Sequence, residues 1–377
     1  MKHSVLIQTH FVAAFAAVAL LSPAVQAQLP VDASKATAWV SGLEGPRGLA
    51  FGPDGELYIA EAGTGGSNST VGVCAQPAAP IGPYKGGTTA RISKVDSHGT
   101  RSTLATGLPS ALDGTGAVEG VADVAFLDGK LYAVLAGGGC AHANPDLPNG
   151  IVKVDYRSGK WSYVTDLTAF YQEHPAAYVA SDFDTAGVPY AMIAHNDKLF
   201  VVEANHGVIT ATTPEGATHQ VLDTSLAYGH VVPTSIASNG FNLYVGSLGV
   251  FPISPTAASI VTLSKELFFI DTTPGLETKP SELGKFRIAN SRAGFTTIVS
   301  LKFGHDGLLY ALELSDAPGG PAPGNGKVVR LDADGKIVDV VTGLNVPTGM
   351  AFGPDHDLYI SNWGAGGPGA ILRIRIP

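Results

Sequence analysis

Acidic side chains recur at one fixed position in a repeated segment of this chain. Four residues after the leucine of successive Leu-aromatic pairs stand Glu61, Glu203 and Glu313, and Asn362 takes the same place in the last copy. If these positions end strands that surround one axis, their oxygens meet at one opening. Ca²⁺ takes six to eight oxygen ligands, mostly carboxylates and carbonyls. The pattern therefore suggests a cation site, or a carboxyl that acts as acid or base because neighbouring like charges raise its pKa.

The same positions also have a plainer interpretation. Each glutamate could cap the loop beside its own strand, or pair with a cation such as Arg47, without any shared site. Adjacent residues of a strand point to opposite faces, so an error of one residue in the register would separate the carboxylates. The sequence leaves both alternatives open.

Two histidines provide a second set of candidate groups. His206 follows Glu203 by three residues, and His142 follows Cys140 by two. Histidine is the commonest metal ligand and a frequent general base, so both are candidate catalytic residues. No two histidines share a metal-binding spacing, and the segment from Glu203 to His206 lacks the first histidine of the zinc-protease signature. The alternative is that both are polar loop residues.

Cys74 and Cys140 are the two cysteines of the chain. Each follows the second predicted strand of neighbouring repeats, so both should emerge at the same end of the molecule. In an oxidising compartment this placement predicts a disulfide. Two partly buried free thiols are the alternative, because sequence does not determine connectivity.

The elements that would position these groups come from a sixfold repeat. Each copy has two runs of alternating apolar residues around a tight turn, which is typical of a β-hairpin. Asp-Gly pairs supply the positive φ that such turns need. A second hairpin follows in several copies, so one copy predicts four antiparallel strands. The six Leu-aromatic pairs that mark the copies are Leu57-Tyr58, Leu131-Tyr132, Leu199-Phe200, Leu243-Tyr244, Leu309-Tyr310 and Leu358-Tyr359.

Six such sheets around an axis make an all-β fold, the six-bladed β-propeller. The last copy lacks its outermost strand, whereas residues 37–43 resemble an outer strand but precede the first inner one. We therefore expect this N-terminal strand to complete the last blade, which leaves few exposed strand edges. An open stack of sheets is the alternative, and it would require capping units. Because the copies run from end to end, residues 28–377 are predicted to form a single propeller domain.

Long insertions are expected at one end of this ring. In a four-stranded meander, the link from strand two to strand three and the link to the next blade leave from the same end. The turns at the opposite end, between strands one and two and between strands three and four, are short in this sequence. Residues 272–292 form a further long segment that this rule does not place. The insertions are residues 62–88, 113–120, 137–149, 170–188, 248–259 and 315–326. Elaborated loops at one end predict a working face there.

The N-terminus and the overall charge restrict where the protein acts. Residues 1–27 have the pattern of a cleavable signal peptide, with Lys2, an apolar run and Val25-Gln26-Ala27. The apolar run is too short to span a membrane, so the predicted location is periplasmic or secreted, without membrane insertion. The formal net charge of −9 argues against nucleic acid as a partner. The sequence contains no nucleophile elbow, phosphate loop, dinucleotide fingerprint or Cys-x-x-Cys pair.

Several segments resemble the ScyD/ScyE family of secreted NHL-like propellers. The resemblance extends roughly from residue 38 to the C-terminus. Its segments are residues 42–63 (GLEGPRGLAFGPDGELYIAEAG), 188–190 (VPY), 199–207 (LFVVEANHG), 232–235 (VPTS), 243–246 (LYVG) and 294–299 (GFTTIV). The resemblance implies a secreted propeller and no particular reaction. Blade four departs from the family, because Leu248 follows Ser247 where relatives often have a Glu-Leu-Thr stretch.

The sequence therefore predicts an exported binding module of the ScyD/ScyE type, whose loop-rich end holds a small molecule, a glycan or a partner protein. The alternative is a metal-assisted hydrolase, lactonase or lyase, similar to calcium-dependent lactonase-type propellers. In that interpretation Glu61, Glu203 and Glu313 hold a divalent cation such as calcium, and His206 or His142 moves protons. The ScyD/ScyE family is named for genes near those of scytonemin pigment biosynthesis. By analogy, a third hypothesis is an oxidative or cyclising role, which no redox motif in the sequence supports.

Overall fold

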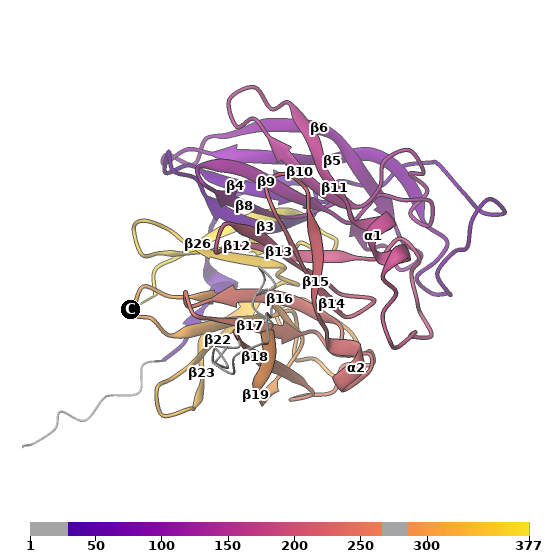
Figure 1. The fold of residues 1–377 in the computed structure, drawn as a ribbon. Helices are drawn as coiled ribbons and strands as arrows, with labels where there is room; N and C mark the ends of the chain where they lie inside the picture. The colour runs from indigo at the N-terminus through magenta and orange to yellow at the C-terminus, as the bar shows by residue number, and fades with distance from the viewer. Residues whose placement is uncertain (1–28, 266–285, 377) are drawn as a thin grey trace, which may run out of the picture.

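The strands form six sheets arranged around a central axis (Figure 1). The structure, a computed structural model, describes residues 29–265 and 286–376. Each sheet contains a meander of four antiparallel strands, and two sheets have a fifth short strand at their edge. In five of the six meanders the four strands follow one another in chain order. The first strands of consecutive blades contact one another around the axis, including those of the last and first blades. The predicted six-bladed β-propeller is therefore confirmed.

Blades one to three take up the first part of the ring. Their strands are β3 (Pro46–Phe51), β4 (Leu57–Glu61), β5 (Lys85–Val95), β6 (Arg101–Leu112) and β7 (Val118–Glu119) in blade one, β8 (Val121–Leu127), β9 (Lys130–Leu135), β10 (Gly150–Val154) and β11 (Trp161–Asp166) in blade two, and β12 (Pro189–His195), β13 (Lys198–Glu203), β14 (Val208–Thr212) and β15 (Thr218–Asp223) in blade three. Two helices follow outer strands, α1 (Leu167–Glu173) and α2 (Thr224–Tyr228).

Blades four to six complete the ring. Their strands are β16 (Pro233–Ser238), β17 (Asn242–Ser247), β18 (Ala258–Lys265) and β19 (Phe286–Phe295) in blade four, β20 (Ile298–Phe303), β21 (Leu309–Glu313), β22 (Gly326–Leu331) and β23 (Ile337–Leu344) in blade five, and β24 (Gly349–Phe352), β25 (Leu358–Asn362) and β26 (Gly369–Ile374) in blade six. The N-terminal elements are β1 (Val31–Asp32), the 3-10 helix η1 (Ala33–Lys35) and β2 (Ala38–Leu43).

The Leu-aromatic pairs lie on the second strand of every blade, and all six leucines are buried. In three blades the tyrosine hydroxyl donates a hydrogen bond to an aspartate of the preceding turn. Tyr58 bonds to Asp54 at 2.8 Å, and the tyrosines of blades five and six make the same bond. The repeated spacing therefore has a physical origin, because one side chain fills the interface between blades and the next fixes the turn.

The N-terminal strand closes the ring, as expected. β2 pairs antiparallel with β26, with Ala38 opposite Leu372 and Leu43 opposite Gly369. Val40 and Leu43 are buried in the cluster between blades six and one. The sequence did not predict the short strand β1, which adds to blade five by pairing in parallel with β23.

The two ends of the ring differ as the loop lengths predicted. The six long insertions and both helices lie at one end, on the right in Figure 1, which we call the loop-rich end. The turns between first and second strands lie at the opposite, short-turn end, where the C-terminus also lies. The predicted signal peptide falls outside the described residues, as does most of the 272–292 segment. No helix in the described part of the chain is long and apolar enough to cross a membrane.

Candidate functional site

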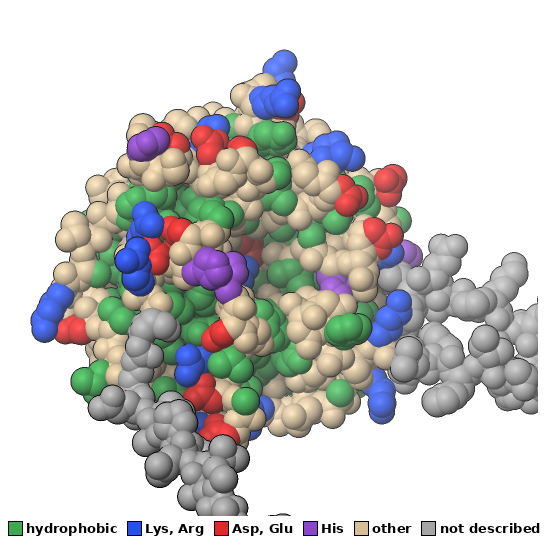
Figure 2. All heavy atoms as spheres, turned by 90° about the vertical axis from the view of Figure 1, so that its left-hand side faces the viewer, with side chains coloured by type: hydrophobic (Ala, Val, Ile, Leu, Met, Phe, Trp, Pro, Cys, Tyr) green, Lys and Arg blue, Asp and Glu red, His purple; other side chains and the backbone are tan. Residues whose placement is uncertain are grey.

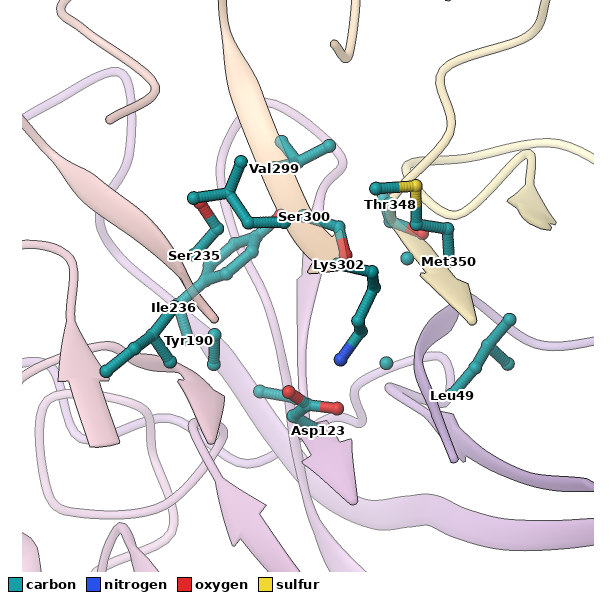
Figure 3. A pocket seen from close by; sticks show the side chains of 15 residues that line it. Leu49, Asp123, Tyr190, Ser235, Ile236, Val299, Ser300, Lys302, Thr348 and Met350 are labelled. Atoms are coloured by element: carbon teal, nitrogen blue, oxygen red, sulfur yellow. The ribbon is translucent and has the colours of Figure 1, made fainter. Parts of the chain in front are cut away.

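The first strands of all six blades surround a narrow cavity on the axis. Its volume is about 20 Å³, enough for roughly one water molecule. Polar side chains from four blades reach it, among them Asp123, Tyr190, Ser235, Ser300 and Lys302 (Figure 3). The axis is therefore a polar passage rather than a filled apolar core.

A wider cavity of about 340 Å³ opens at the short-turn end. Figure 2 shows this end of the molecule, with a hollow at its centre and histidine side chains beside it. The lining residues are Leu49, Ala50, Lys302, Phe303, Gly304, His305, Ala351 and Phe352. Leu49 and Lys302 line both cavities. A volume of this size lies in the usual range for small-molecule pockets, roughly 300–1,000 Å³.

Lys302 and Asp123 are the two charged side chains at the junction of these cavities. Figure 3 shows both pointing into the cavity from β20 and β8. The Asp123 carboxylate accepts hydrogen bonds from the backbone N–H of Met192 at 2.9 Å and of Val124 at 2.8 Å. Burial raises the pKa of Asp123, although the nearby Lys302 and these bonds act in the opposite direction. No hydrogen bond or ion pair joins the Lys302 ammonium to another residue within 29–265 or 286–376.

The carboxylate of Glu61 is held inside blade one. The side chain has no exposed surface, and its oxygens accept from Ser93, from Arg91 at 2.8 Å and from Arg101 at 3.3 Å. A fourth bond comes from the backbone N–H of Glu44 at 2.7 Å. All of these donors belong to blade one or to the segment that enters it.

Glu203 and Asn362 have a similar capping role in their own blades. The Glu203 carboxylate accepts four backbone N–H groups, from Val188, Asn205, His206 and Gly207. The Asn362 side-chain oxygen accepts from the backbone N–H of Asn345 at 2.8 Å. Each of these residues ends a second strand and bonds to the segment just before the first strand of the same blade.

The third glutamate, Glu313, accepts from the backbone N–H of Thr296 at 2.9 Å. Its other oxygen is buried without a hydrogen-bond partner in the described structure, and the Lys327 ammonium lies 3.7 Å away. Burial raises the pKa of Glu313 to about 7, although the Thr296 bond and Lys327 lower it.

The structure therefore does not bring the acidic positions together at one opening. Within residues 29–265 and 286–376, no group of three or more His, Cys, Asp or Glu side chains could hold a metal ion. In the four blades that have them, Glu61, Glu203, Glu313 and Asn362 each accept a backbone N–H from the loop that enters the first strand. These bonds agree with the plainer interpretation, and a metal-binding role for the four residues stays a prediction.

Replacing Glu313 by glutamine should flatten the dependence of stability on pH. In the unfolded chain this carboxyl loses its proton near the ordinary value of 4.5, but in the folded protein near 7. The folded state therefore holds an extra proton between these values, so the free energy of unfolding falls as pH rises through this window. At about 1.4 kcal/mol per pKa unit, the loss is up to roughly 3 kcal/mol.

Urea unfolding at several pH values from about 5 to 8 measures this slope. Glutamine resembles the protonated carboxyl and does not titrate, so the variant should lose less stability than the wild type over the window. Parallel curves for the two proteins would contradict a raised pKa at Glu313. Asp339→Asn is a matched control, because this aspartate also lies near Lys327 but is half-exposed.

His142 is completely buried between two insertions of the loop-rich end. Its Nε2 atom lies 2.9 Å from Oδ2 of Asp184, outside the angles of a hydrogen bond, and the two form an ion pair when the imidazole is protonated. The Nδ1 atom lies 2.7 Å from the carbonyl oxygen of Gly138. Burial alone would lower the pKa of His142, but Asp184 and Glu119 raise it above its ordinary value. Both ring nitrogens are thus engaged within the protein.

His206 lies on the other side of the same aspartate. Its Nε2 atom is 2.6 Å from the carbonyl oxygen of Asp184, and its ring stacks on Phe183 at a centroid distance of 4.4 Å. The structure therefore brings the two candidate histidines together around Asp184. Their contacts connect loops of blades two and three, which is a structural role.

A disulfide joins Cys74 to Cys140, with 6.2 Å between the Cα atoms. It connects the long insertions of blades one and two. Beside it, the Thr70 hydroxyl donates to the carbonyl oxygen of Cys140 at 2.6 Å. Together with the His142–Asp184 pair, the disulfide connects loops of three consecutive blades at the loop-rich end.

The sequence matches no protein-family model and no curated protein. Its fold is similar to that of several solved structures. A putative oxidoreductase (glucose dehydrogenase) of Thermus thermophilus is 18% identical with a TM-score of 0.53, over 90% of this chain and 99% of that one. The PQQ-bound aldose sugar dehydrogenase of Streptomyces coelicolor is 13% identical with a TM-score of 0.51, over 90% and 97% of the two chains. A putative gluconolactonase is 13% identical with a TM-score of 0.51, over 90% and 93%. At such identities the similarity establishes the propeller fold.

The cofactor of the sugar dehydrogenase does not fit the residues found here. PQQ has three carboxylates, whereas the wider cavity has a single ammonium, that of Lys302, beside mainly apolar side chains. The described residues likewise contain no cluster of metal ligands. We derive no chemical step through either group.

Sequence reasoning missed the residues at the junction of the two cavities, although a signal was present. Lys302 and Asp123 are charged residues inside largely apolar inner strands, residues 298–303 and 121–127. In a propeller the first strand of each blade lines the axis, so a charge within it faces the channel. Searching the first strands rather than the ends of the second strands would have found both.

Proposed function

We propose that the protein is an exported propeller of the ScyD/ScyE type that binds a small organic molecule in its axial channel. The observation that supports this is the cavity of about 340 Å³ at the short-turn end. Binding sites for small molecules are concave and mostly apolar, with a few polar groups that orient the ligand. Five of the eight lining residues here have apolar side chains, and Lys302 and His305 provide the polar groups.

The proposal places the ligand at the short-turn end rather than among the long loops. At the loop-rich end of β3, Arg47 is only 8% exposed and donates to the carbonyl oxygen of Val118. Its guanidinium lies 5.9 Å from the centre of the Tyr190 ring, which also lines the narrow cavity. These side chains narrow the axis at that end, so the short-turn end provides the access.

A fragment screen by ligand-observed NMR tests this proposal, with neutral and charged compounds of one or two rings. We expect several to bind wild type and Ala50→Phe to weaken their binding at least tenfold, because the added ring occupies the cavity. Ligands should also raise the melting temperature of wild type. At a hundredfold excess over Kd, they should increase the free energy of unfolding by about 2.7 kcal/mol.

Phe241→Ala is the control for this screen. Phe241 is 83% exposed on the turn between β16 and β17, also at the short-turn end, and does not line the cavity. Its replacement should leave binding unchanged. If Ala50→Phe melts like wild type and binds equally well, the ligand does not occupy this cavity. Should that variant fail to fold, Phe352→Ala, which enlarges the cavity, must alter the set of compounds that bind.

A second candidate function is hydrolysis of a small ester or lactone in the same channel. It is favoured by the placement of Asp123 and Lys302 on facing strands, because a carboxylate can activate water and an ammonium can stabilise an oxyanion. The fold shared with a putative gluconolactonase agrees with it. Hydrolysis of δ-gluconolactone above the rate in buffer would support this candidate.

A further inference from the structure

We propose that the ligand of the channel is an organic carboxylate with an aromatic or other apolar body. This inference rests on the proposed function and names the chemical class that the same site recognises. In this arrangement the carboxylate binds the Lys302 ammonium, and the apolar body fills the wider cavity against Phe303 and Phe352.

The first step concerns Lys302. Lys302 lines both cavities, and Figure 3 shows its ammonium pointing into the narrow one, toward Asp123, without a hydrogen bond or ion pair to another described residue. An ammonium without a hydrogen-bond partner is free to make a charge-assisted hydrogen bond with an anion. Among the residues that line the wider cavity, Lys302 is the one with a fixed positive charge.

Asp123 does not take the place of that anion. Its two oxygens accept backbone N–H groups of Val124 and Met192, and no ion pair within 4.0 Å joins it to Lys302. It lines the narrow cavity but not the wider one. A ligand carboxylate therefore has to reach Lys302 from the wider cavity, which Asp123 does not line.

The second step concerns the walls. Of the eight lining residues, five have apolar side chains and Gly304 has none. The other two, Lys302 and His305, have polar side chains. The His305 ring is fixed by a contact of 3.1 Å between its Nε2 atom and the carbonyl oxygen of Gly353. It lies edge-on to Phe352 at a centroid distance of 6.0 Å and against His356 at 4.0 Å. Such ring edges and faces suit a flat apolar body.

The same walls disfavour the other ligand classes expected from the sequence. A glycan needs many hydrogen-bond partners, and this lining offers those of Lys302, His305 and the backbone. A metal cation would meet the positive charge of Lys302. A carboxylate with an apolar body is the ligand class that can contact both the Lys302 ammonium and the apolar side chains of the lining.

Isothermal titration with phenylacetate and its neutral counterpart phenylacetamide tests the inference. The two probes have the same ring and nearly the same shape. We expect wild type to bind phenylacetate at least tenfold more tightly than phenylacetamide, with the difference decreasing as salt is added. Lys302→Met should abolish this preference while retaining phenylacetamide binding, and Lys302→Arg should keep the preference.

The outcomes separate the inference from the proposed function. Equal affinity of wild type for the two probes overturns the inference, as does a preference that survives in Lys302→Met; binding of phenylacetamide through the cavity still supports the proposed function. If neither probe binds but neutral fragments do, the inference is also overturned. If nothing in the fragment screen binds, both fail. The comparison of probes on wild type requires no variant to fold.

Discussion

Replacing Glu61 by alanine is expected to destabilise the protein by about 3–5 kcal/mol, because removing one partner of a buried ion pair leaves uncompensated charge. Glu61 is wholly buried and contacts two guanidinium groups, those of Arg91 and Arg101. Its loss would also leave the backbone N–H of Glu44 without its acceptor. Such a loss is a large part of the stability of a typical domain.

Urea unfolding with and without calcium measures this effect. Glu56→Ala is the matched control, because Glu56 pairs with Lys94 in the same blade but both side chains are partly exposed. Exposed pairs contribute roughly 0–1 kcal/mol, so that variant should remain close to wild type. A Glu61→Ala protein as stable as the Glu56→Ala control would contradict the structural role. A stability loss that appears only in calcium would show that the carboxylate is a metal ligand after all.

Removing the N-terminal closing strand should have the largest effect of all. A chain that begins at Glu44 lacks β2, so β26 becomes an exposed edge and the buried side chains of Val40 and Leu43 are lost. Exposed strand edges pair with other chains. We therefore expect this chain to aggregate, or to remain unfolded, when expressed without its first 43 residues.

A chain that begins at Ala36 provides the comparison. It loses β1 and η1 but keeps β2, so the sixth blade retains four strands. The two-residue pairing of β1 with β23 contributes little, and this chain should be soluble and melt close to the longer one. Size-exclusion chromatography and thermal melting compare the two. If the chain from Glu44 elutes as a folded monomer, closure by β2 is not what stabilises the ring.

The fold could be predicted because each repeat contains two adjacent side chains with separate structural roles. Leu57 fills the interface between blades, and Tyr58 bonds to the turn at Asp54. Both roles depend only on the spacing of residues within one repeat, so both can be recognised in the sequence. The short strand β1 was missed because a two-residue pairing leaves no periodic pattern.

The candidate site could not be found from spacing in the same way. Glu61 and Glu203 stand at equivalent positions whether they bind a metal or cap a loop, and only the donors around them distinguish the two roles. Those donors come from segments of different length and composition. Lys302 and Asp123 each occur in one blade only, so a search for what the blades share passes over them.

The turns at the short-turn end have a consequence for the kinetics of the proposed ligand binding. Gly52, Gly304 and Gly353 begin such turns, and each turn is closed by backbone hydrogen bonds. Turns of so few residues change conformation little, so the binding site is already formed before the ligand arrives. Capture should then follow a single diffusive step, with a rate proportional to ligand concentration and no plateau in stopped-flow traces.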